Sequence, residues 1–284
     1  MRYFGFEAGS RAGLSTELFF ADYKKHVSSD DSLKLSDKDF FYSKVKSPYS
    51  FVERCTDKQA MREITANDCI FPCDELTRQS NRQIGEIASG KMYSNIDRMF
   101  YDKRKVNSLL SSIAKGLLIP KTFQVEEVFV KPNSMSAGSK GCKRKCGLCV
   151  SEYIHIKKEY VVDCLKWNSV ISIFPRQVIL KNGYDKYIKL IPAASNVGDK
   201  TIEFIESVDG YGLFDGIFHI QVAEDYQGRL FYIEASKRIS GSSIVNLERG
   251  YNPFFSINRK KREAEQKFEE LQWYRFEDFI YGKV

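Results

Sequence analysis

The sequence lacks several features that would place it at once in a familiar class of protein. No stretch approaches the roughly 18 to 20 apolar residues that a membrane helix needs. The start, MRYFGFEAGSRAG, has no apolar region typical of a signal peptide, and there is no internal repeat or low-complexity tail. These absences predict a cytoplasmic, globular protein. Its 284 residues suffice for one large domain or for two to three smaller ones.

Side chains that bind transition metals are also few. The chain has three isolated histidines and seven cysteines, an odd number that predicts free thiols when no export signal is present. Cys142, Cys146 and Cys149 form CxxxCxxC, a spacing seen in radical iron–sulfur enzymes, but no second cysteine group follows them. We interpret them as loop cysteines, and a bound metal or cluster is the alternative.

The charge balance is mildly basic. The net charge is +7, but lysine and arginine are scattered among 37 acidic residues, and only the runs 140–145 (KGCKRK) and 259–262 (RKKR) stand out. The first run is not interleaved with aromatic side chains on which bases could stack. A basic balance also suits an enzyme that holds a polyanionic nucleotide. We therefore expect a nucleotide ligand, with a nucleic-acid-binding module as the alternative.

Local patterning divides the chain into three regions. In the first, short strands are expected at 1–6, 50–54 and 68–72, between polar, helix-like segments. Apolar residues at spacings of three and four then predict a helix over 102–118, ended by Gly116 and Pro120, and a buried strand at 125–130. From residue 151 the pattern predicts strands at 159–165, 174–180 and 187–191, a hairpin over 216–236, a charged amphipathic helix at 258–272 and a last strand at 273–281.

The first segment with a chemical signal is FVKPNSMSAGSKG, residues 129–141. A buried strand delivers Lys131 at its end, and a loop of serine, glycine and lysine follows. Small residues let backbone N–H groups approach phosphate oxygens, and lysine neutralises their charge. The segment does not have the GxxxxGK[ST] pattern of a P-loop, so a surface linker is the alternative.

The second segment is SEYIHIKKEYVVD, residues 151–163. An extended backbone at Tyr153 and Ile154 could pair with the edge of an adenine ring. Glu159 could hold ribose hydroxyls with its two acceptor oxygens. The alternative is an ordinary amphipathic pair of strands.

The third segment, FHIQVAEDYQGRLFYIEAS, predicts a β-hairpin. A two-residue turn at 227–228 would place Gln221 opposite Glu234, and the alternation of side chains adds Ser236 to the same face. Amide, carboxylate and hydroxyl oxygens suit Mg²⁺. The opposite face is expected to be apolar and to pack on a core, through Phe218, Ile220, Val222, Phe231 and Ile233. The alternative is a surface hairpin with polar outer residues.

Taken in this order, the segments from Asp102 to Pro253 resemble the ATP-grasp superfamily, in particular the carbamoyl-phosphate synthase large subunit and short amino-acid ligases. The resemblance assigns Lys103 to the nucleotide and Lys131 to its phosphates. It implies a flexible phosphate loop at 134–141, with the cofactor-binding residues Ser136, Gly138 and Ser139. It also implies an adenine-contacting hinge of Glu152, Tyr153 and Ile154, followed by Glu159 on the ribose.

The metal and reaction sites follow from the same likeness. The run IEASKR resembles the family's IE-x-N-x-R strand, which implies Gln221 as first metal ligand, Glu234 as bridging ligand and Ser236 as a third. It implies Arg238 on the γ-phosphate and the acyl phosphate. Arg176 matches an arginine near the substrate, with a surface charge as the alternative. Three further candidates are Ser242 and Ser243, which line the substrate end or start a helix, and Glu75, which would face the acceptor.

The implied fold combines α+β and α/β parts, in which two α+β subdomains clamp ATP after a short N-terminal α/β domain. The expected boundaries are 1–98, 99–155 and 156–284. The implied function is an ATP-dependent, ADP-forming carboxylate–amine ligase that works through an acyl phosphate, with ATP and Mg²⁺ or Mn²⁺ as cofactors. The expected partners are a small-molecule carboxylate and amine, with amino acids suggested by the family, and a second copy in a homodimer.

The chain departs from the family pattern in three places. Ser236 stands where the family usually has asparagine, and a serine hydroxyl is the poorer ligand, so a second metal would be weaker, water-bridged or absent. The insertion at 142–149 is unusual, and the first domain is short and without a clear glycine-rich turn. Two alternatives therefore stand beside the ligase, namely a kinase that phosphorylates a small-molecule acceptor and a non-catalytic ATP-binding protein.

Overall fold

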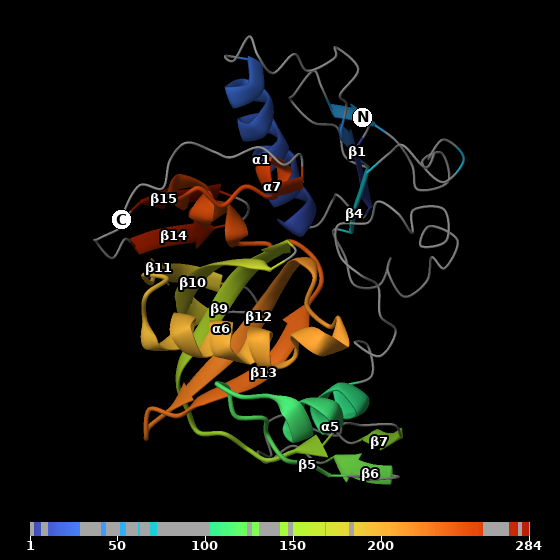
Figure 1. The fold of residues 1–284 in the computed structure, drawn as a ribbon, viewed down its shortest axis with the longest axis vertical. Coiled ribbons are helices and arrows are strands. Elements are labelled where there is room, and N and C mark those ends of the chain that lie inside the picture. The colour runs from blue at the N-terminus through green and yellow to red at the C-terminus, as the bar shows by residue number, and fades with distance from the viewer. Residues whose placement is uncertain are drawn as a thin grey trace.

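The computed structural model describes residues 3–6, 11–28, 41–43, 52–54, 62, 69–72, 103–123, 127–130, 143–146, 150–167, 169–181, 185–257, 273–277 and 280–283. Figure 1 shows them in three tiers, with a small sheet and a helix above, a large sheet in the middle, and a helix with short strands below. Within these ranges no helix is both long and apolar enough to cross a membrane.

The upper tier contains a parallel sheet. Its strands are β1 (Tyr3–Phe6), β2 (Phe41–Ser43), β3 (Val52–Arg54) and β4 (Cys69–Pro72), in the order β3-β2-β1-β4. Helix α1 (Arg11–Ser28) follows β1. Parallel strands with helix α1 between β1 and β2 fit the α/β arrangement that the sequence predicted for this part. Three of the four strands were predicted, whereas the three-residue β2 was missed.

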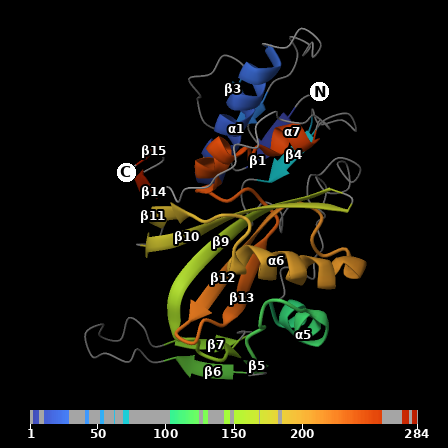
Figure 2. The ribbon, with the colours of Figure 1, turned by 60° about the vertical axis from the view of Figure 1, so that its left-hand side comes forward.

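The middle tier is one antiparallel sheet in the order β13-β12-β9-β10-β11-β14-β15. Its strands are β9 (Ile156–Trp167), β10 (Val170–Lys181), β11 (Asp185–Leu190), β12 (Gly216–Asp225), β13 (Leu230–Ser236), β14 (Trp273–Glu277) and β15 (Ile280–Lys283). Figure 2 shows how strongly β9 curves along the sheet. Every predicted strand of this region is present, except that the single strand predicted at 273–281 is two paired strands, β14 and β15. The helix predicted at 258–272 lies outside the described residues.

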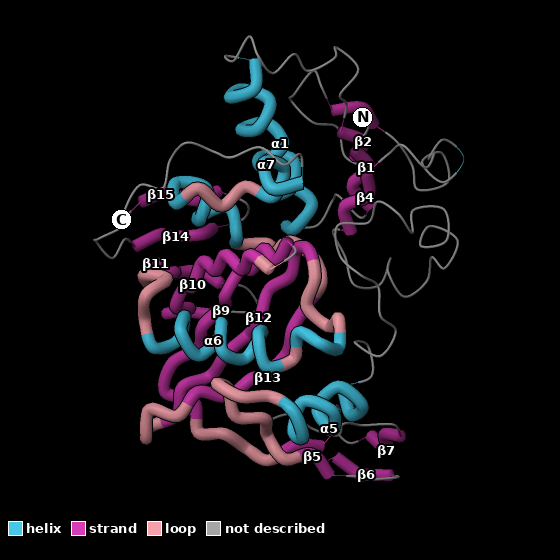
Figure 3. Tube along the Cα trace, in the orientation of Figure 1, coloured by secondary structure: helices cyan, strands magenta, loops and turns pink. Residues whose placement is uncertain are grey.

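Helix α6 (Asn196–Ser207) covers one face of this sheet, as Figures 1 and 3 show. Ser195 caps its N-terminus, because its hydroxyl accepts a hydrogen bond from the backbone N–H of Gly198 at 3.3 Å. Phe204 on the helix packs against Phe214 and stacks on Tyr232 of β13, with ring centroids 5.5 and 5.3 Å apart. The residue pattern between 151 and 234 predicted strands only, and the presence of α6 corrects that prediction.

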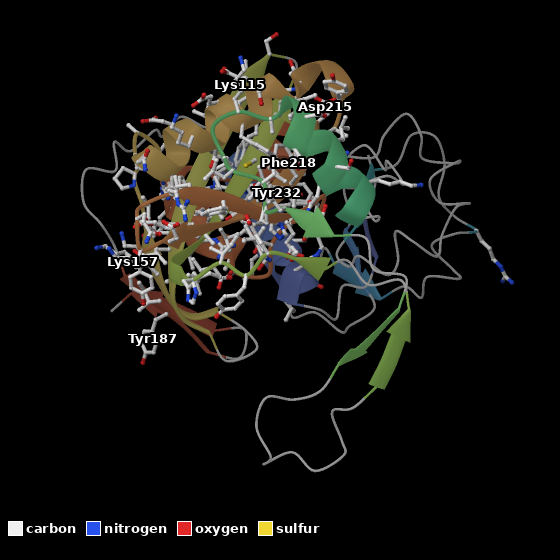
Figure 4. The ribbon with its side chains drawn as sticks, turned by 90° about the horizontal axis from the view of Figure 1, so that it is seen from below. Lys115, Lys157, Tyr187, Asp215, Phe218 and Tyr232 are labelled. Atoms are coloured by element: carbon white, nitrogen blue, oxygen red, sulfur yellow. The ribbon has the colours of Figure 1, made fainter. Side chains whose placement is uncertain are left out.

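The lower tier begins with helix α5 (Lys103–Ile113). The short strands β5 (Thr122–Phe123), β6 (Glu127–Val130), β7 (Lys143–Cys146) and β8 (Val150–Ser151) pair as β5 with β8 and β6 with β7. Figure 4, seen from below, shows the β6–β7 pair pointing away from the body. The predicted apolar face of α5 is confirmed, since Val106 and Leu110 are buried in the main core. The helix is shorter than predicted, because it ends three residues before Gly116.

A second group of helices closes the upper end of the large sheet. These are the 3-10 helix η4 (Ser243–Arg249) and α7 (Pro253–Ile257), and both pack against α1. The Phe19 ring of α1 meets Tyr251 edge-on at 5.2 Å, and Phe20 lies 5.1 Å from Phe254. The hydroxyl of Ser15 donates to the carbonyl of Gly241 at 2.8 Å. These contacts fasten the segment after β13 to the N-terminal part of the chain (Figure 1).

Candidate functional site

The β12–β13 hairpin brings Gln221 and Glu234 together as predicted, but through a turn and a register that differ from the prediction. The turn is one residue longer than predicted, because the N–H of Asp225 donates to the carbonyl of Arg229. A β-bulge between Gln221 and Val222 then shifts the register back by one residue. As a result Gln221 pairs with Glu234, as predicted, although the predicted turn was wrong.

The bulge also changes which residues of β13 face the core. Phe231 pairs with Ala223 and therefore shares the face of Gln221, not the apolar face to which it was assigned. Leu230 and Tyr232 take its place in the core. Ile233, also predicted on the apolar face, sits at the bulge and is only half-buried. The predictions for Phe218, Ile220 and Val222 are confirmed, since all three are fully buried.

The face of the large sheet opposite to α6 is polar. Residues that pair directly across antiparallel strands share a face, and three such rows cross β10, β9, β12 and β13. The rows are Val178–Glu159–Ala223–Phe231, Arg176–Val161–Gln221–Glu234 and Phe174–Asp163–His219–Ser236. Neighbouring rows are two residues apart, or about 7 Å along a strand. Six polar residues thus gather within three adjacent rows, beside Ser236 at the end of β13. They are Glu159, Asp163, Arg176, His219, Gln221 and Glu234.

At the centre of this face Gln221 and Glu234 touch. The Gln221 amide donates to a Glu234 carboxylate oxygen at 3.0 Å, and both side chains are half-buried. A carboxylate with an amide oxygen beside it, still reachable by water, fits Mg²⁺, which binds few protein oxygens and keeps its other positions for water and phosphate. Among the described residues no three His, Cys, Asp or Glu side chains gather into a metal site. The donor set therefore fits Mg²⁺ better than a transition metal.

The chain leaves this face through the residues that follow β13. Ser236 and Lys237 are buried, whereas Arg238 is half-buried. The Nδ1 of His219 donates to the carbonyl of Arg238 at 3.1 Å, and the Arg238 guanidinium reaches the carbonyl of Ile239 at 3.0 Å. Arg238 therefore stands at the edge of the polar face with its backbone fixed to β12.

Arg176 lies inside the protein. Its side chain and that of Asp163 are both 0% exposed, and its Nε donates to Asp163 Oδ2 at 3.0 Å. The two terminal nitrogens donate to the hydroxyls of Ser242 and Ser240, each at 2.6 Å. The alternative of a surface charge is therefore wrong.

The two serines that were expected to line the substrate end or to start a helix differ in their contacts. Ser242 stands at the N-cap of η4 but makes no capping hydrogen bond, because its hydroxyl accepts from Arg176. The hydroxyl of Ser243 donates to the carbonyl of Ser240 at 2.7 Å. The helix-start interpretation is thus confirmed for their position.

Burial also governs the ionisation of a tyrosine beside this network. Tyr251 is fully buried between Phe19 and Phe174. Burial raises the pKa of its hydroxyl well above the ordinary value, and the nearby charge of Asp163 raises it further. Tyr251 therefore stays neutral at any ordinary pH.

The core face carries a separate polar cluster at its lower end. Tyr160 donates to a Glu224 oxygen at 2.6 Å, and Lys158 donates to the same carboxylate at 3.0 Å. Burial alone would raise the pKa of Glu224, but these two hydrogen bonds, together with the charges of Lys158 and Lys157, outweigh it and lower the pKa. Glu224 stays charged down to acid pH, on the face opposite to Glu234.

The remaining predicted residues lie below the sheet or outside the description. Lys103 is the first residue of α5. Glu152, Tyr153 and Ile154 lie in the link between β8 and β9, where the N–H of Glu152 donates to the carbonyl of Lys121 and Tyr153 is 84% exposed. Lys131, Ser136, Gly138, Ser139, Glu75, Cys142 and Cys149 lie outside the described residues, whereas Cys146 ends β7.

No protein-family model and no curated protein matches the sequence. Solved structures do match. N5-carboxyaminoimidazole ribonucleotide synthetase from Thermus thermophilus superposes with a TM-score of 0.64 at 12% identity, over 97% of this chain and 82% of that one. A protein assigned to the ATP-grasp superfamily from Archaeoglobus fulgidus gives 0.62 at 12%, over 97% and 92%.

The chain has the ATP-grasp fold. N5-carboxyaminoimidazole synthetase from Staphylococcus aureus, solved with ADP, superposes equally well, with a TM-score of 0.62 at 12% identity over 96% of this chain and 81% of that one. The fold predicted from the motifs is thereby confirmed. At this identity the likeness shows the fold alone.

Sequence reasoning missed four residues of the ATP-grasp sheet's polar face and its cover, namely Asp163, His219, Ser240 and Asn246. A signal was present for the first of them. Asp163 stands inside the apolar strand YVVDCL, and Arg176 stands inside the next strand. Two opposite charges within neighbouring apolar strands have to be paired, because an unpaired buried charge is very costly. That rule would have predicted the ion pair.

Proposed function

We propose that the chain is an ATP-dependent ligase, which activates a carboxylate as an acyl phosphate and transfers it to an amine with release of ADP and phosphate. One observation carries the proposal, namely that Glu159, Gln221 and Glu234 stand in adjacent rows on one face of an ATP-grasp sheet, with Arg238 at its edge. The Staphylococcus aureus relative in fold was solved with ADP, which supports a nucleotide as the ligand of this face.

The reaction has two steps. A carboxylate oxygen of the substrate attacks the γ-phosphorus of ATP, the bond from that phosphorus to the bridging oxygen breaks, and ADP leaves. The amine nitrogen then attacks the acyl carbon, the bond from that carbon to the phosphate oxygen breaks, and the amine loses a proton. Positioning and charge stabilisation are the protein's main contributions to such a transfer.

Each candidate residue has a proposed role in this reaction. Glu159 would hold the ribose hydroxyls at one end of the face, and Arg238 would stabilise the charge on the transferring phosphoryl group at the other. Gln221 and Glu234 would hold Mg²⁺, which supplies charge neutralisation at the phosphates when it is bound. Lys103, Lys131 and the loop residues Ser136, Gly138 and Ser139 are proposed to hold the phosphates, and Glu152 to Ile154 the adenine. The proposed domain boundaries remain 1–98, 99–155 and 156–284.

The test is ATP consumption by the purified chain with Mg²⁺ across pairs of amino acids and small carboxylates, with nucleotide and organic products identified by mass spectrometry. We expect ADP, phosphate and a condensed product with particular pairs only. Glu234→Gln is expected to lower this turnover by at least about 100-fold, because the neutral amide holds the cation more weakly and several kcal/mol of charge stabilisation depend on it.

The matched control is Glu224→Gln. It makes the same substitution on the same hairpin, but on the face opposite to Glu234, and it should retain turnover. A phosphorylated acceptor without a condensed product would replace the ligase by a kinase. Binding of ATP without turnover by any pair would point to the non-catalytic alternative, for which Ser236 in place of asparagine is the reason. Either result contradicts the proposal.

A further inference from the structure

The segment that follows Arg238 is held to the sheet by buried side chains rather than by strand pairing. Beneath it lies the guanidinium of Arg176, which donates from Nε to Asp163 and from its two terminal nitrogens to Ser242 and Ser240. All three distances are between 2.6 and 3.0 Å, and the hydroxyls of both serines belong to buried residues. The planar fork of arginine is suited to such fixed geometry.

A second set of bonds fastens the same segment from its other side. Asn246 is fully buried and donates to the same Asp163 oxygen at 2.8 Å. Arg249 donates to the carbonyl of Pro175 at 2.9 Å and to that of Ile191 at 2.8 Å. Residues 240–249 are thus clamped onto β9, β10 and the end of β11 at several points.

Arg238 lies between two fixed points of the chain, its own carbonyl and Ser240. Its own carbonyl accepts from His219 at 3.1 Å, and Ser240, the first residue held by Arg176, follows two positions later. Two residues span at most about 7 Å, so a shift of Ser240 moves Arg238 as well. The position of Arg238 therefore depends on Arg176 and Asp163, which share the polar face of the sheet but are fully buried beneath this segment.

The charge of Arg176 is already compensated. Its partner carboxylate lies 3.0 Å away with both side chains fully buried, and the strong donors that a substrate carboxylate would use are occupied by Asp163 and the two serines. Such a guanidinium is better suited to holding a chain segment than to capturing a ligand.

We infer that the Asp163–Arg176 pair is a positioning device, which fixes Ser240 and Ser242 and thereby holds Arg238 against the phosphates of ATP. The inference rests on the proposed nucleotide site and replaces the role of Arg176 as a direct substrate ligand. A displacement of about 1 Å in a catalytic group can cost about 100-fold in rate, so loosening this clamp affects catalysis without touching the nucleotide.

The test removes the two hydroxyls and leaves the ion pair in place. The double variant Ser240→Ala, Ser242→Ala is expected to lower kcat for ATP turnover by about 10- to 100-fold. It should also weaken ATP binding while AMP binding stays unchanged, since Arg238 would meet the terminal phosphate. Arg238→Gln should give the same loss of preference for ATP over AMP, and adding the two serine changes to it should have little further effect.

The matched control also removes two serine hydroxyls, but on the other face. Ser195 caps α6, and Ser207 at its end accepts from the N–H of Lys115 at 2.9 Å. The double variant Ser195→Ala, Ser207→Ala should lower the melting temperature and leave both kcat and the ATP-to-AMP preference as in the wild type. If the Ser240, Ser242 variant behaves in this way too, the clamp is merely structural and the inference is overturned.

The binding measurement separates this inference from the proposed function. A wild type that prefers ATP to AMP but turns over no substrate pair would refute the ligase, while the effect of the serine changes on the preference would still decide the role of the clamp. If the wild type binds ATP no better than AMP, Arg238 does not contact the terminal phosphate. Both the proposed function and the inference about the clamp would then be overturned.

Discussion

Replacing Arg176 by methionine is expected to lower the free energy of unfolding by about 3–5 kcal/mol, measured by urea denaturation followed by circular dichroism. Methionine fills much of the same volume but carries no charge, so the carboxylate of Asp163 is left buried without its partner. The hydroxyls of Ser240 and Ser242 lose their donors at the same time. An uncompensated buried charge is among the few causes of losses this large from one substitution.

Arg229→Met is the matched control for this prediction. Arg229 also pairs with an aspartate, Asp225, with Nε 2.7 Å from the carboxylate, but its side chain is 59% exposed. The Asp225 carboxylate is only 3% exposed, but it keeps hydrogen bonds from the backbone N–H groups of Gln227 and Arg229 when the pair is broken, so the loss should be much smaller. The same loss in both variants would mean that burial of the arginine does not set the strength of the Asp163–Arg176 pair.

A double-mutant cycle measures the interaction between Asp163 and Arg176 directly. Asp163→Asn leaves the arginine without a counter-charge and should cost nearly as much as Arg176→Met. The double variant has no lone charge, so it should lose less than the sum of the two single losses, by at least about 1 kcal/mol. Strict additivity would contradict a direct interaction between the two side chains.

Most of the large sheet could be predicted from the sequence, because strands that are buried on one face alternate in a way that residue types reveal. Helix α6 could not be found as easily. Its segment NVGDKTIEFIES carries only four apolar residues, Val197, Ile202, Phe204 and Ile205, among glycine, charged and polar ones. The three-residue strand β2 escaped for a simpler reason, since alternation needs at least four residues to be visible.

The candidate site divides in the same way. The pairing of Gln221 with Glu234 could be predicted, because both residues lie within one hairpin, whereas Arg238 was named only from the family resemblance and its role stays a proposal. The partners of Arg176 could not be predicted, because Ser240 and Ser242 lie more than 60 positions away along the chain. Their meeting depends on how η4 packs over β10, which no local pattern encodes. The correct Gln221–Glu234 pairing itself owed its success to a bulge that cancelled a wrong turn.

Gly116 was predicted from the sequence as a helix end, and the structure gives a second reason for a glycine at this position. Its φ is +80°, in the left-handed region where a side chain is disfavoured by about 1–2 kcal/mol. An added Cβ would also lie 2.4 Å from the carbonyl oxygen of Lys200 and 2.9 Å from the nitrogen of Phe204, both in the backbone of α6. Neither atom can yield without moving the helix that covers the core.

Gly116→Ala is therefore expected to destabilise the protein by about 2–5 kcal/mol, the sum of backbone strain and overpacking. Gly228→Ala is the matched control, since its φ of +77° imposes the same strain while nothing lies within 4 Å of the added Cβ. It should lose only about 1–2 kcal/mol in the same urea titration. The difference between the two variants measures the contact between Gly116 and α6. Equal losses would show that the α5–α6 junction adjusts freely, and that the left-handed turn alone requires glycine before Leu118 reaches β13.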